Sequence, residues 1–302
     1  METIPIIDYE GSDYQQTFWE QGDRAYEDAA EAVALRRLLP PKGDFLLELG
    51  AGAGRNTPRY QGFARVALLD YSLSQLQQAQ KALGTSARYV YVAADVYALP
   101  FLPARFDATT LIRTLHHLAE PRRALAEARR VLRPEGIFVL EFANKRNLKA
   151  IARYALRRQS WSPFDPEPIE FAPLNFDFHP RAVRAWLRES GLAVDRQLTV
   201  SHLRIGWLKR HVPLKVLVTL DSLFQWSGNL WQLTPSVFVR ARATGPAAAP
   251  ERGYPEGALF ACPRCAGPLD EQAGRLVCPH CRLAYPVIDG IYDLRNKDAR
   301  PL

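Results

Sequence analysis

Short apolar runs recur along the first half of the chain and alternate with segments of helical periodicity. The run 45–49 leads directly into glycines, which is typical of a buried parallel strand. The runs predict strands over 45–49, 66–69, 88–94, 108–112 and 137–142, and the periodic segments predict helices over 13–39, 73–83 and 121–132. This regular alternation predicts a doubly wound α/β sheet with helices on both faces.

The second half continues the pattern less regularly. We expect a helix over 181–190, a strand over 192–200, a helical stretch over 204–230 and a last strand over 236–242. Residues 244–257 are rich in Ala, Pro and Gly, so they read as a linker. The expected organisation is therefore a main domain over 1–243 with a helical insert at about 203–233, a linker over 244–257, and a small domain over 258–302.

Composition narrows the class of protein. With 302 residues and 47% hydrophobic content, the chain can form a large core beside a small second domain. The most apolar region, 212–226, is interrupted by Lys215 and Asp221 and is too short to span a bilayer. No basic start followed by an apolar run is present, and every cysteine lies in one C-terminal segment. We therefore expect a cytoplasmic protein.

The segment 46–54, LLELGAGAG, combines an apolar strand with three alternating glycines. Glycines are needed where the backbone turns sharply and a ligand lies against it. A dinucleotide fingerprint requires a third glycine where Arg55 stands, which argues against NAD. Glu48 lies two residues before the first glycine and suits a cationic amine better than a pyrophosphate.

Two further carboxylates follow predicted strands. Asp70 lies 20 residues after Gly50, where a carboxylate can accept hydrogen bonds from both hydroxyls of a ribose. Asp95 and Val96 end the third strand and offer a side chain and a backbone amide to an adenine edge. The three strand ends together predict a nucleoside site.

These residues resemble motif I and the later motifs of class I S-adenosylmethionine-dependent methyltransferases, most of all the branch of the ubiquinone-biosynthesis methyltransferases. The resemblance is carried by Glu48–Gly54, Asp70–Ser72, Asp95–Val96, Leu99–Phe101, Phe106–Asp107, Leu115–His117 and Val131–Gly136. It implies a Rossmann-like seven-stranded mixed sheet with an antiparallel last strand. It also implies S-adenosylmethionine as cosubstrate, bound by Glu48, Gly50, Ala51, Gly52, Gly54, Asn56, Asp70, Tyr71, Asp95, Val96 and Arg113. The alternatives are a domain for another nucleotide and a scaffold without catalysis.

The chemistry after the fourth strand is less specific. Methyl transfer from a sulfonium needs alignment of the acceptor and exclusion of water, and a general base is optional. His116, His117 and Arg113 are the candidate catalytic residues, although the histidine pair is equally consistent with packing. The Asn/Asp-Pro-Pro motif of amino-methylating relatives is absent, which disfavours adenine and glutamine amides as acceptors.

The acceptor class stays open between two hypotheses. A small molecule or lipid-like metabolite, held by aromatic residues of the insert, is favoured. RNA is the alternative, bound by two basic stripes at helical spacing, which are Lys149, Arg153 and Arg157, and Arg181, Arg184 and Arg188. The same stripes suit an anionic lipid surface or an ordinary solvated helix face.

Two CxxC pairs mark the C-terminal segment. Cys262 and Cys265 are followed twelve residues later by Cys278 and Cys281, which is the ligand set of a structural zinc ribbon. A redox pair is the alternative. The following run 285–291 resembles Trm112-like zinc proteins, which activate methyltransferases. This resemblance implies an activator fused to the catalytic domain, covering one of its apolar faces through an intramolecular contact.

Overall fold

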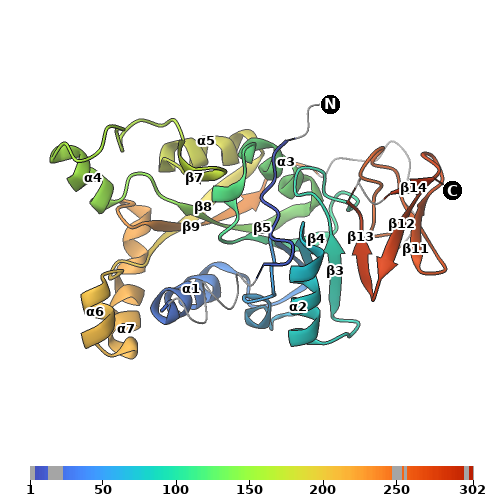
Figure 1. Ribbon diagram of the computed structural model, residues 1–302, viewed down its shortest axis with the longest axis horizontal. Helices are drawn as coiled ribbons and strands as arrows, with labels where there is room; N and C mark the ends of the chain where they lie inside the picture. The colour runs from blue at the N-terminus through green and yellow to red at the C-terminus, as the bar shows by residue number, and fades with distance from the viewer. Residues whose placement is uncertain (1–3, 13–22, 247–253, 255–256, 296–298, 302) are drawn as a thin grey trace.

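A computed structural model describes residues 4–12, 23–246, 254, 257–295 and 299–301. A twisted sheet crosses the whole molecule, in the order β10-β11-β12-β13-β3-β2-β1-β4-β5-β9-β8, with β14 paired to β12 (Figure 1). The strands of its main part are β1 (Gly43–Leu49), β2 (Phe63–Asp70), β3 (Tyr89–Ala93), β4 (Phe106–Leu111), β5 (Leu132–Ala143), β8 (Leu192–Val200) and β9 (Ser236–Ala243). These seven strands confirm the expected Rossmann-like mixed sheet.

Strand direction follows the expected pattern. Strands β3, β2, β1, β4 and β5 run parallel, and β9 inserts antiparallel between β5 and β8. The near-continuous apolar sequence of β1 and β2 is explained by helices on both faces, because side chains that point in either direction are then buried.

Helices form two layers over the sheet. Helices α1 (Ala25–Leu38) and α2 (Leu73–Leu83) pack on one face, and α3 (Pro121–Val131) and α5 (Pro180–Glu189) pack on the other (Figure 1). Each layer encloses its own apolar core, one centred on Leu46 and Leu68 and the other on Leu47 and Phe138. The remaining helices are α4 (Leu148–Ala155), α6 (Gly206–His211), α7 (Leu214–Phe224), and the 3-10 turns η2 (Thr57–Arg59), η3 (Leu115–His117) and η4 (Gln225–Asn229).

The cysteine-rich part continues the main sheet. Its strands are β10 (Asp270–Gln272), β11 (Arg275–Cys278), β12 (Leu283–Ile288), β13 (Ile291–Asp293) and β14 (Arg300–Pro301). Strand β13 pairs parallel with the edge strand β3, with Ile291 opposite Tyr91 and Asp293 opposite Ala93. The cysteine-rich part therefore makes the expected intramolecular contact, and strand pairing at the edge of the sheet is part of it.

An apolar contact adds to this attachment. The ring of Phe260 stacks on that of Phe101 at 5.9 Å between centroids. The two flanking backbone hydrogen bonds run from Leu102 N to Leu259 O and from Ala261 N to Pro100 O, at 2.9 and 3.0 Å. The apolar core under α3 consequently extends without a break into the cysteine-rich part.

Three local expectations differ from the structure. The first helix begins at Ala25, because Asp23 adopts a left-handed φ of 52°, and the expected stretch 13–22 lies outside the described residues. The stretch 204–230 is broken at Pro213 into α6, α7 and η4, since proline has no amide hydrogen to continue a helix. The hairpin of β6 (Ile169–Ala172) and β7 (Asn175–Asp177) was not predicted. Within the described residues, no helix is long and apolar enough to cross a bilayer.

Candidate functional site

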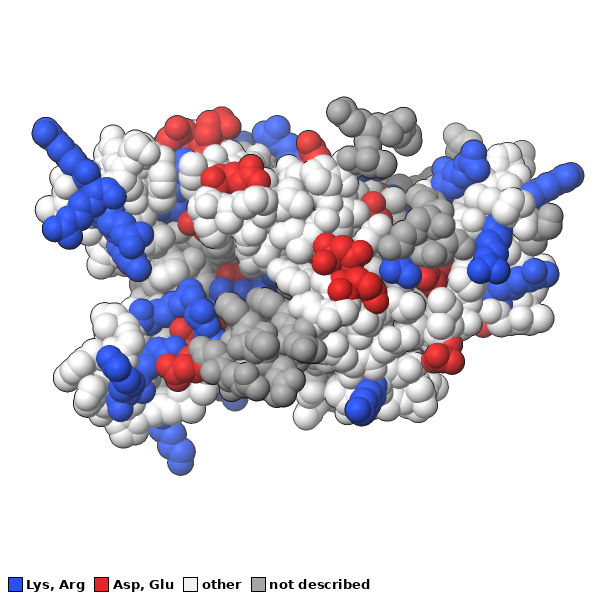
Figure 2. All heavy atoms as spheres, viewed as in Figure 1, with Lys and Arg blue, Asp and Glu red and all other residues white. Residues whose placement is uncertain are grey.

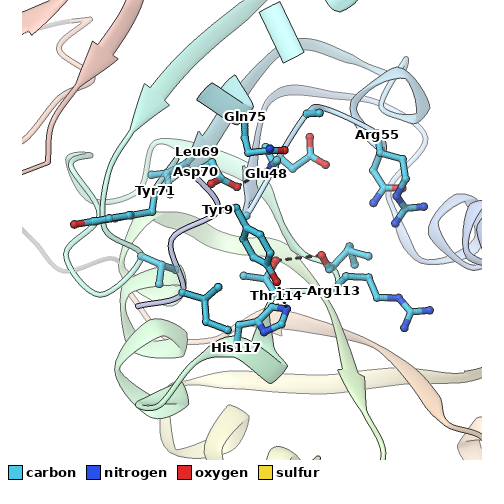
Figure 3. A pocket seen from close by; sticks show the side chains of 18 of the residues that line it. Tyr9, Glu48, Arg55, Leu69, Asp70, Tyr71, Gln75, Arg113, Thr114 and His117 are labelled. Atoms are coloured by element: carbon cyan, nitrogen blue, oxygen red, sulfur yellow. Dashed lines mark hydrogen bonds between the residues drawn. The ribbon is translucent and has the colours of Figure 1, made fainter. Parts of the chain in front are cut away.

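A pocket opens at the carboxyl ends of the central parallel strands, where the chain order reverses between β1 and β4. This edge is the usual ligand site of open α/β sheets. The pocket is lined by Ile6, Ile7, Tyr9, Glu48, Gly50, Ala51, Gly52, Ala53, Arg55, Asn56, Leu69, Asp70, Tyr71, Gln75, Ala94, Val96, Ile112, Arg113, Thr114, His117 and Leu118 (Figure 3). It thus brings together most of the residues that the sequence suggested, while Gly54, Asp95 and His116 lie outside its lining.

The glycine loop after β1 needs glycine for two separate reasons. Gly50, Gly52 and Gly54 all have positive φ, which other residues adopt only at a cost. A side-chain carbon on Gly50 would also lie 2.2 Å from Thr114 Oγ1, whereas one on Gly52 would meet its nearest atom at 3.9 Å. A side-chain carbon on Gly54 would lie 2.9 Å from Leu83 Cδ1, so the glycine allows α2 to pack closely on the loop.

This difference predicts unequal effects of two matched substitutions. Gly50→Ala and Gly52→Ala both incur the left-handed backbone cost of about 1–2 kcal/mol. Gly50→Ala adds an overlap with Thr114 and should be less stable by a further ~1–3 kcal/mol. Urea unfolding of both variants measures the gap. Equal free energies of unfolding would contradict the close approach of Gly50 and Thr114.

Glu48 lies at the base of the pocket and is nearly inaccessible. Its carboxylate accepts hydrogen bonds from Thr57 Oγ1 at 2.6 Å and from the Tyr60 hydroxyl at 3.1 Å. Burial raises the pKa of Glu48 to about 7, and the two hydrogen bonds act in the opposite direction. A buried carboxylate with this pKa is prepared to meet a cationic group.

Asp70 holds the loop from the neighbouring strand. Its Oδ2 accepts from the amide of Gly52 at 2.8 Å and its Oδ1 from the amide of Ser72 at 2.9 Å. Burial raises the pKa of Asp70, and these backbone donors oppose the shift. In Figure 3 its side chain faces the same space as Glu48. Asp70 and the glycine loop are therefore fixed relative to each other before any ligand enters.

The third strand end contributes backbone more than side chain. Ala94 and Val96 line the pocket, while Asp95 Oδ1 accepts from the amide of Tyr97 at 2.8 Å. The Ala94 amide is itself occupied by a hydrogen bond to the Asp70 carbonyl at 3.0 Å. Of the two residues predicted to contact adenine, Val96 therefore lines the pocket, whereas the Asp95 carboxylate is hydrogen-bonded within its own turn.

Arg113 is part of a buried charge cluster that the sequence did not reveal. Its Nε donates to Oε1 of the fully buried Glu31 at 2.7 Å, and its backbone amide donates to Glu141 at 3.1 Å. Arg55 bonds the other oxygen of Glu31 at 2.9 Å. The two arginines lower the pKa of Glu31 despite its burial. Arg113 is therefore held in place on the pocket wall by α1 and β5.

Of the two histidines, His117 lines the pocket and His116 does not. His117 Nδ1 lies 3.3 Å from the Leu174 carbonyl, and its Nε2 lies 3.2 Å from the Tyr9 hydroxyl. A carbonyl only accepts, so the proton sits on Nδ1 and Nε2 is the acceptor. Burial lowers the pKa of both His117 and His116. His116 is half-buried, and its Nδ1 is shielded from solvent without a hydrogen-bond partner among the described residues.

An N-terminal segment crosses over the pocket, and nothing in its sequence indicated this. Ile6, Ile7 and Tyr9 line the cavity, and Figure 3 shows Tyr9 reaching across it toward His117. Glu10 fixes the segment to the start of α2, since its carboxylate accepts from the amides of Leu73 at 2.9 Å and Ser74 at 3.1 Å. Carboxylates are favoured at a helix N-terminus, which explains this anchor.

The four cysteines converge into a candidate metal centre. The Sγ atoms of Cys262, Cys265, Cys278 and Cys281 all lie within 4.8 Å of one another. A tetrahedral zinc ion with Zn–S bonds of about 2.3 Å requires S···S separations of about 3.8 Å, so the set fits Zn²⁺. The Tyr285 hydroxyl lies 3.4 Å from Cys262 Sγ, and the Cys281 amide donates to Cys278 Sγ at 3.3 Å. His280 is exposed and lies outside the cluster.

Comparison with known proteins decides the family. Residues 47–140 match the methyltransferase domain family, and residues 259–290 match the Trm112p-like protein family. The chain contains a class I methyltransferase domain fused to a Trm112p-like domain. The pocket belongs to the methyltransferase domain, and the cysteine cluster belongs to the Trm112p-like domain.

The relatives of the methyltransferase domain include proteins named as methyltransferases of quinone biosynthesis. A demethylmenaquinone methyltransferase from Clavibacter sepedonicus is 29% identical over 153 residues, which cover 50% of this chain and 62% of the relative. A ubiquinone/menaquinone biosynthesis C-methyltransferase from Paracoccus denitrificans is 40% identical over 114 residues, covering 35% of this chain and 45% of the relative. The chain therefore spans less than two thirds of either relative's length.

Solved structures agree with the fold. One chain superimposes with a TM-score of 0.54 at 18% identity, over 77% of this chain and 96% of that one. It comes from the complex between the Haloferax volcanii Trm112 methyltransferase activator and a methyltransferase. An S-adenosylmethionine-dependent methyltransferase from Mesorhizobium loti gives a TM-score of 0.53 at 21% identity, over 72% and 99%. At these identities the likeness concerns the fold of the methyltransferase domain.

Proposed function

We propose that the protein transfers a methyl group from S-adenosylmethionine to a small or lipid-like acceptor. The observation that carries this proposal is the pocket itself, in which Glu48, the glycine loop and Asp70 meet at the ends of β1 and β2. The quinone substrates named for two of the relatives support an apolar, ring-containing acceptor. RNA stays the alternative acceptor, supported by the basic stripes Lys149, Arg153 and Arg157, and Arg181, Arg184 and Arg188.

We assign different parts of the donor to different residues of the pocket. The methionine amine is assigned to Glu48 and the glycine loop, and the ribose hydroxyls to Asp70 with Tyr71 beside it. The adenine is assigned to the backbone around Val96 and to the apolar wall of Leu69 and Leu118. Gly50, Ala51, Gly52 and Asn56 bring the backbone against the methionine part.

The reaction is an in-line displacement. The bond between the methyl carbon and the sulfonium sulfur breaks as the acceptor's nucleophilic atom bonds to the carbon, and S-adenosylhomocysteine leaves. Where the nucleophile carries a proton, we assign its removal to His117 Nε2, which becomes available as Tyr9 moves aside. Arg113 orients the acceptor from its fixed position. His116 and Asp95 play no direct part in this scheme.

The raised pKa of Glu48 predicts a pH dependence of donor binding. The donor's amine requires the carboxylate, and this amine stays protonated below about pH 7.7. Because the pKa of Glu48 is about 7 in the free protein, a proton must leave the carboxyl group when the donor binds at lower pH. Affinity should therefore fall about tenfold per pH unit below pH 7. Calorimetry of the protein and of Glu48→Gln tests this, since the variant should bind weakly and lose the slope.

Incubation with methyl-labelled S-adenosylmethionine and a cell extract tests the proposed activity. Label is expected in the fraction that organic solvent extracts, and its appearance there should be slowed by His117→Ala. If label appeared only in RNA, the acceptor would be RNA and not a small or lipid-like molecule. Absence of donor binding would overturn the assignment as an enzyme.

We also propose that the cysteine cluster holds one structural Zn²⁺ and that the Trm112p-like domain supports the donor pocket. Arg295 follows β13 and donates to the Tyr71 carbonyl at 3.3 Å, with its guanidinium 5.9 Å from the Tyr71 ring. It also lies 3.9 Å from Glu10, the anchor of the N-terminal segment. The fused domain thus contacts both the ribose side of the pocket and the segment that covers it.

A further inference from the structure

Large exposed hydrophobic side chains are confined to one stretch of the described chain. Elsewhere in the described ranges, large hydrophobic residues are buried or only partly exposed. The exposed ones are Leu148, Tyr154, Leu156, Phe164, Phe171, Ile205, Trp207, Leu214, Val216, Leu220, Leu223, Phe224, Trp226, Leu230 and Trp231. Such a concentration marks an interaction site, because scattered single residues are the ordinary case.

Helix α4 carries part of this surface. Leu148, Ile151 and Ala155 share one of its faces, and Lys149 and Arg153 occupy the opposite one. Ala150 is its single buried residue and Ile151 is half-buried, so the helix packs only in part on the rest of the protein. An eight-residue helix has little stability of its own in water. A short basic amphipathic helix that projects from a domain is typical of helices that lie in a membrane surface.

Helix α7 carries more of the surface, because it has apolar residues on its outer side as well as on its inner side. Val216, Leu220 and Leu223 follow one another at spacings of four and three residues and are 45%, 39% and 66% exposed. The inner side holds the buried Leu217 and Asp221, and Asp221 accepts a hydrogen bond from the Tyr26 hydroxyl at 2.6 Å. The outer apolar residues therefore have no packing partner among the described residues that would explain them as core, and Trp207 on α6 extends the apolar surface.

The charge of the segments that carry this surface indicates which kind of partner it binds. Residues 148–158 contain Lys149, Arg153, Arg157 and Arg158 and no acidic residue. Residues 204–231 contain Arg204, Lys209, Arg210 and Lys215, and their single acid is the buried Asp221. Arg204 and Lys209 pair with Glu27 on α1, which leaves Arg210 and Lys215 as the cations that this segment offers to an outside partner. Aromatic and aliphatic side chains flanked by lysine and arginine suit a bilayer with anionic headgroups, whereas lysine is depleted in protein interfaces.

Helix α4 and the pair of helices α6 and α7 lie at the same end of the molecule. Figure 1 places α4 and the α6–α7 pair at one end of the long axis, with the Trm112p-like domain at the other. Figure 2 shows Lys and Arg side chains over α4 and over the α6–α7 pair, with some Asp and Glu side chains beside them, and a hollow in the surface between the two. We propose that this end of the protein docks on an anionic lipid bilayer, with α4, α6 and α7 lying in the headgroup layer.

Sedimentation of the full-length protein with vesicles tests this docking without donor or acceptor, so its result is independent of the proposed methyl transfer. Binding is expected to vesicles of phosphatidylcholine mixed with phosphatidylglycerol, to weaken with added salt, and to be much lower on phosphatidylcholine alone. Exposed Trp207 and Trp231 should be quenched by brominated lipids in the same mixture.

Paired variants separate the apolar and the charged contributions. Leu220→Ser with Leu223→Ser, and Lys149→Glu with Arg153→Glu, should each lower vesicle affinity at least about tenfold. Arg181→Glu with Arg188→Glu makes the same charge change on α5, outside the apolar surface, and should bind nearly as well as the parent.

Three results would overturn the proposal. The first is equal weakening by the α5 variant, which would indicate unspecific attraction of a basic protein. The second is unchanged binding by the α4 and α7 variants. The third is self-association or RNA binding that depends on Leu220 and Leu223 while vesicles are not bound, which would assign this surface to a different partner.

Discussion

Replacing Asp70 with Ala is expected to lower the affinity for S-adenosylmethionine by about 100-fold or more. The two proposed hydrogen bonds from ribose hydroxyls to this charged acceptor would contribute about 1.5–3 kcal/mol each, and the variant would lose both. The loop itself also loses the acceptor of the Gly52 and Ser72 amides. Isothermal calorimetry on the full chain gives the affinity directly.

Asp107 provides a matched control for this variant. It likewise accepts from two backbone amides, those of Asp44 and Phe45 at 2.7 and 2.9 Å, but it lies at the opposite end of β1 from the pocket. Asp107→Ala should therefore lose stability and keep donor affinity. If both variants bound the donor equally well, Asp70 would have no role beyond the shape of the loop.

Removal of zinc is expected to unfold the Trm112p-like domain and to disturb the donor pocket. A domain of this size has a small core, and zinc binding by cysteine sites contributes about 10–16 kcal/mol to folding. Cys278→Ser or a strong chelator should eliminate the one zinc ion per chain that elemental analysis is expected to find. His280→Ser changes an exposed residue of the same knuckle and should retain the metal.

Loss of zinc should also destabilise β3, because β13 pairs with it. Once β13 separates, Ala93 O loses the Leu294 amide at 2.8 Å, and Tyr71 loses Arg295. Hydrogen exchange is thus expected to accelerate along β3 as well as in the cysteine-rich part, with a weaker loss of donor affinity than in Asp70→Ala. Full protection of β13 without metal would refute both the zinc site and this coupling.

The sheet and the residues that line the candidate pocket were largely predictable because their determinants are local. Strand β2 is indicated by its apolar run 66–69, and helix α2 by its Ser72 cap and periodicity. Glu48 and Asp70 were found because each stands at a fixed point next to a strand and a glycine loop. The cysteine cluster was found for the same reason, since its ligand spacing is written in short motifs.

Other features depended on contacts between distant parts of the chain. The pairing of β13 with β3, the passage of Tyr9 over the pocket and the joining of Arg113 to Glu31 leave no periodicity or motif in either partner. Helix α7 makes the point most clearly, because its sequence is apolar on more than one side and only the tertiary contacts bury Leu217 while Leu220 and Leu223 stay exposed. Local sequence determined which elements form and which chemistry they carry, and tertiary packing alone decided which faces are buried, since burial depends on neighbours far along the chain.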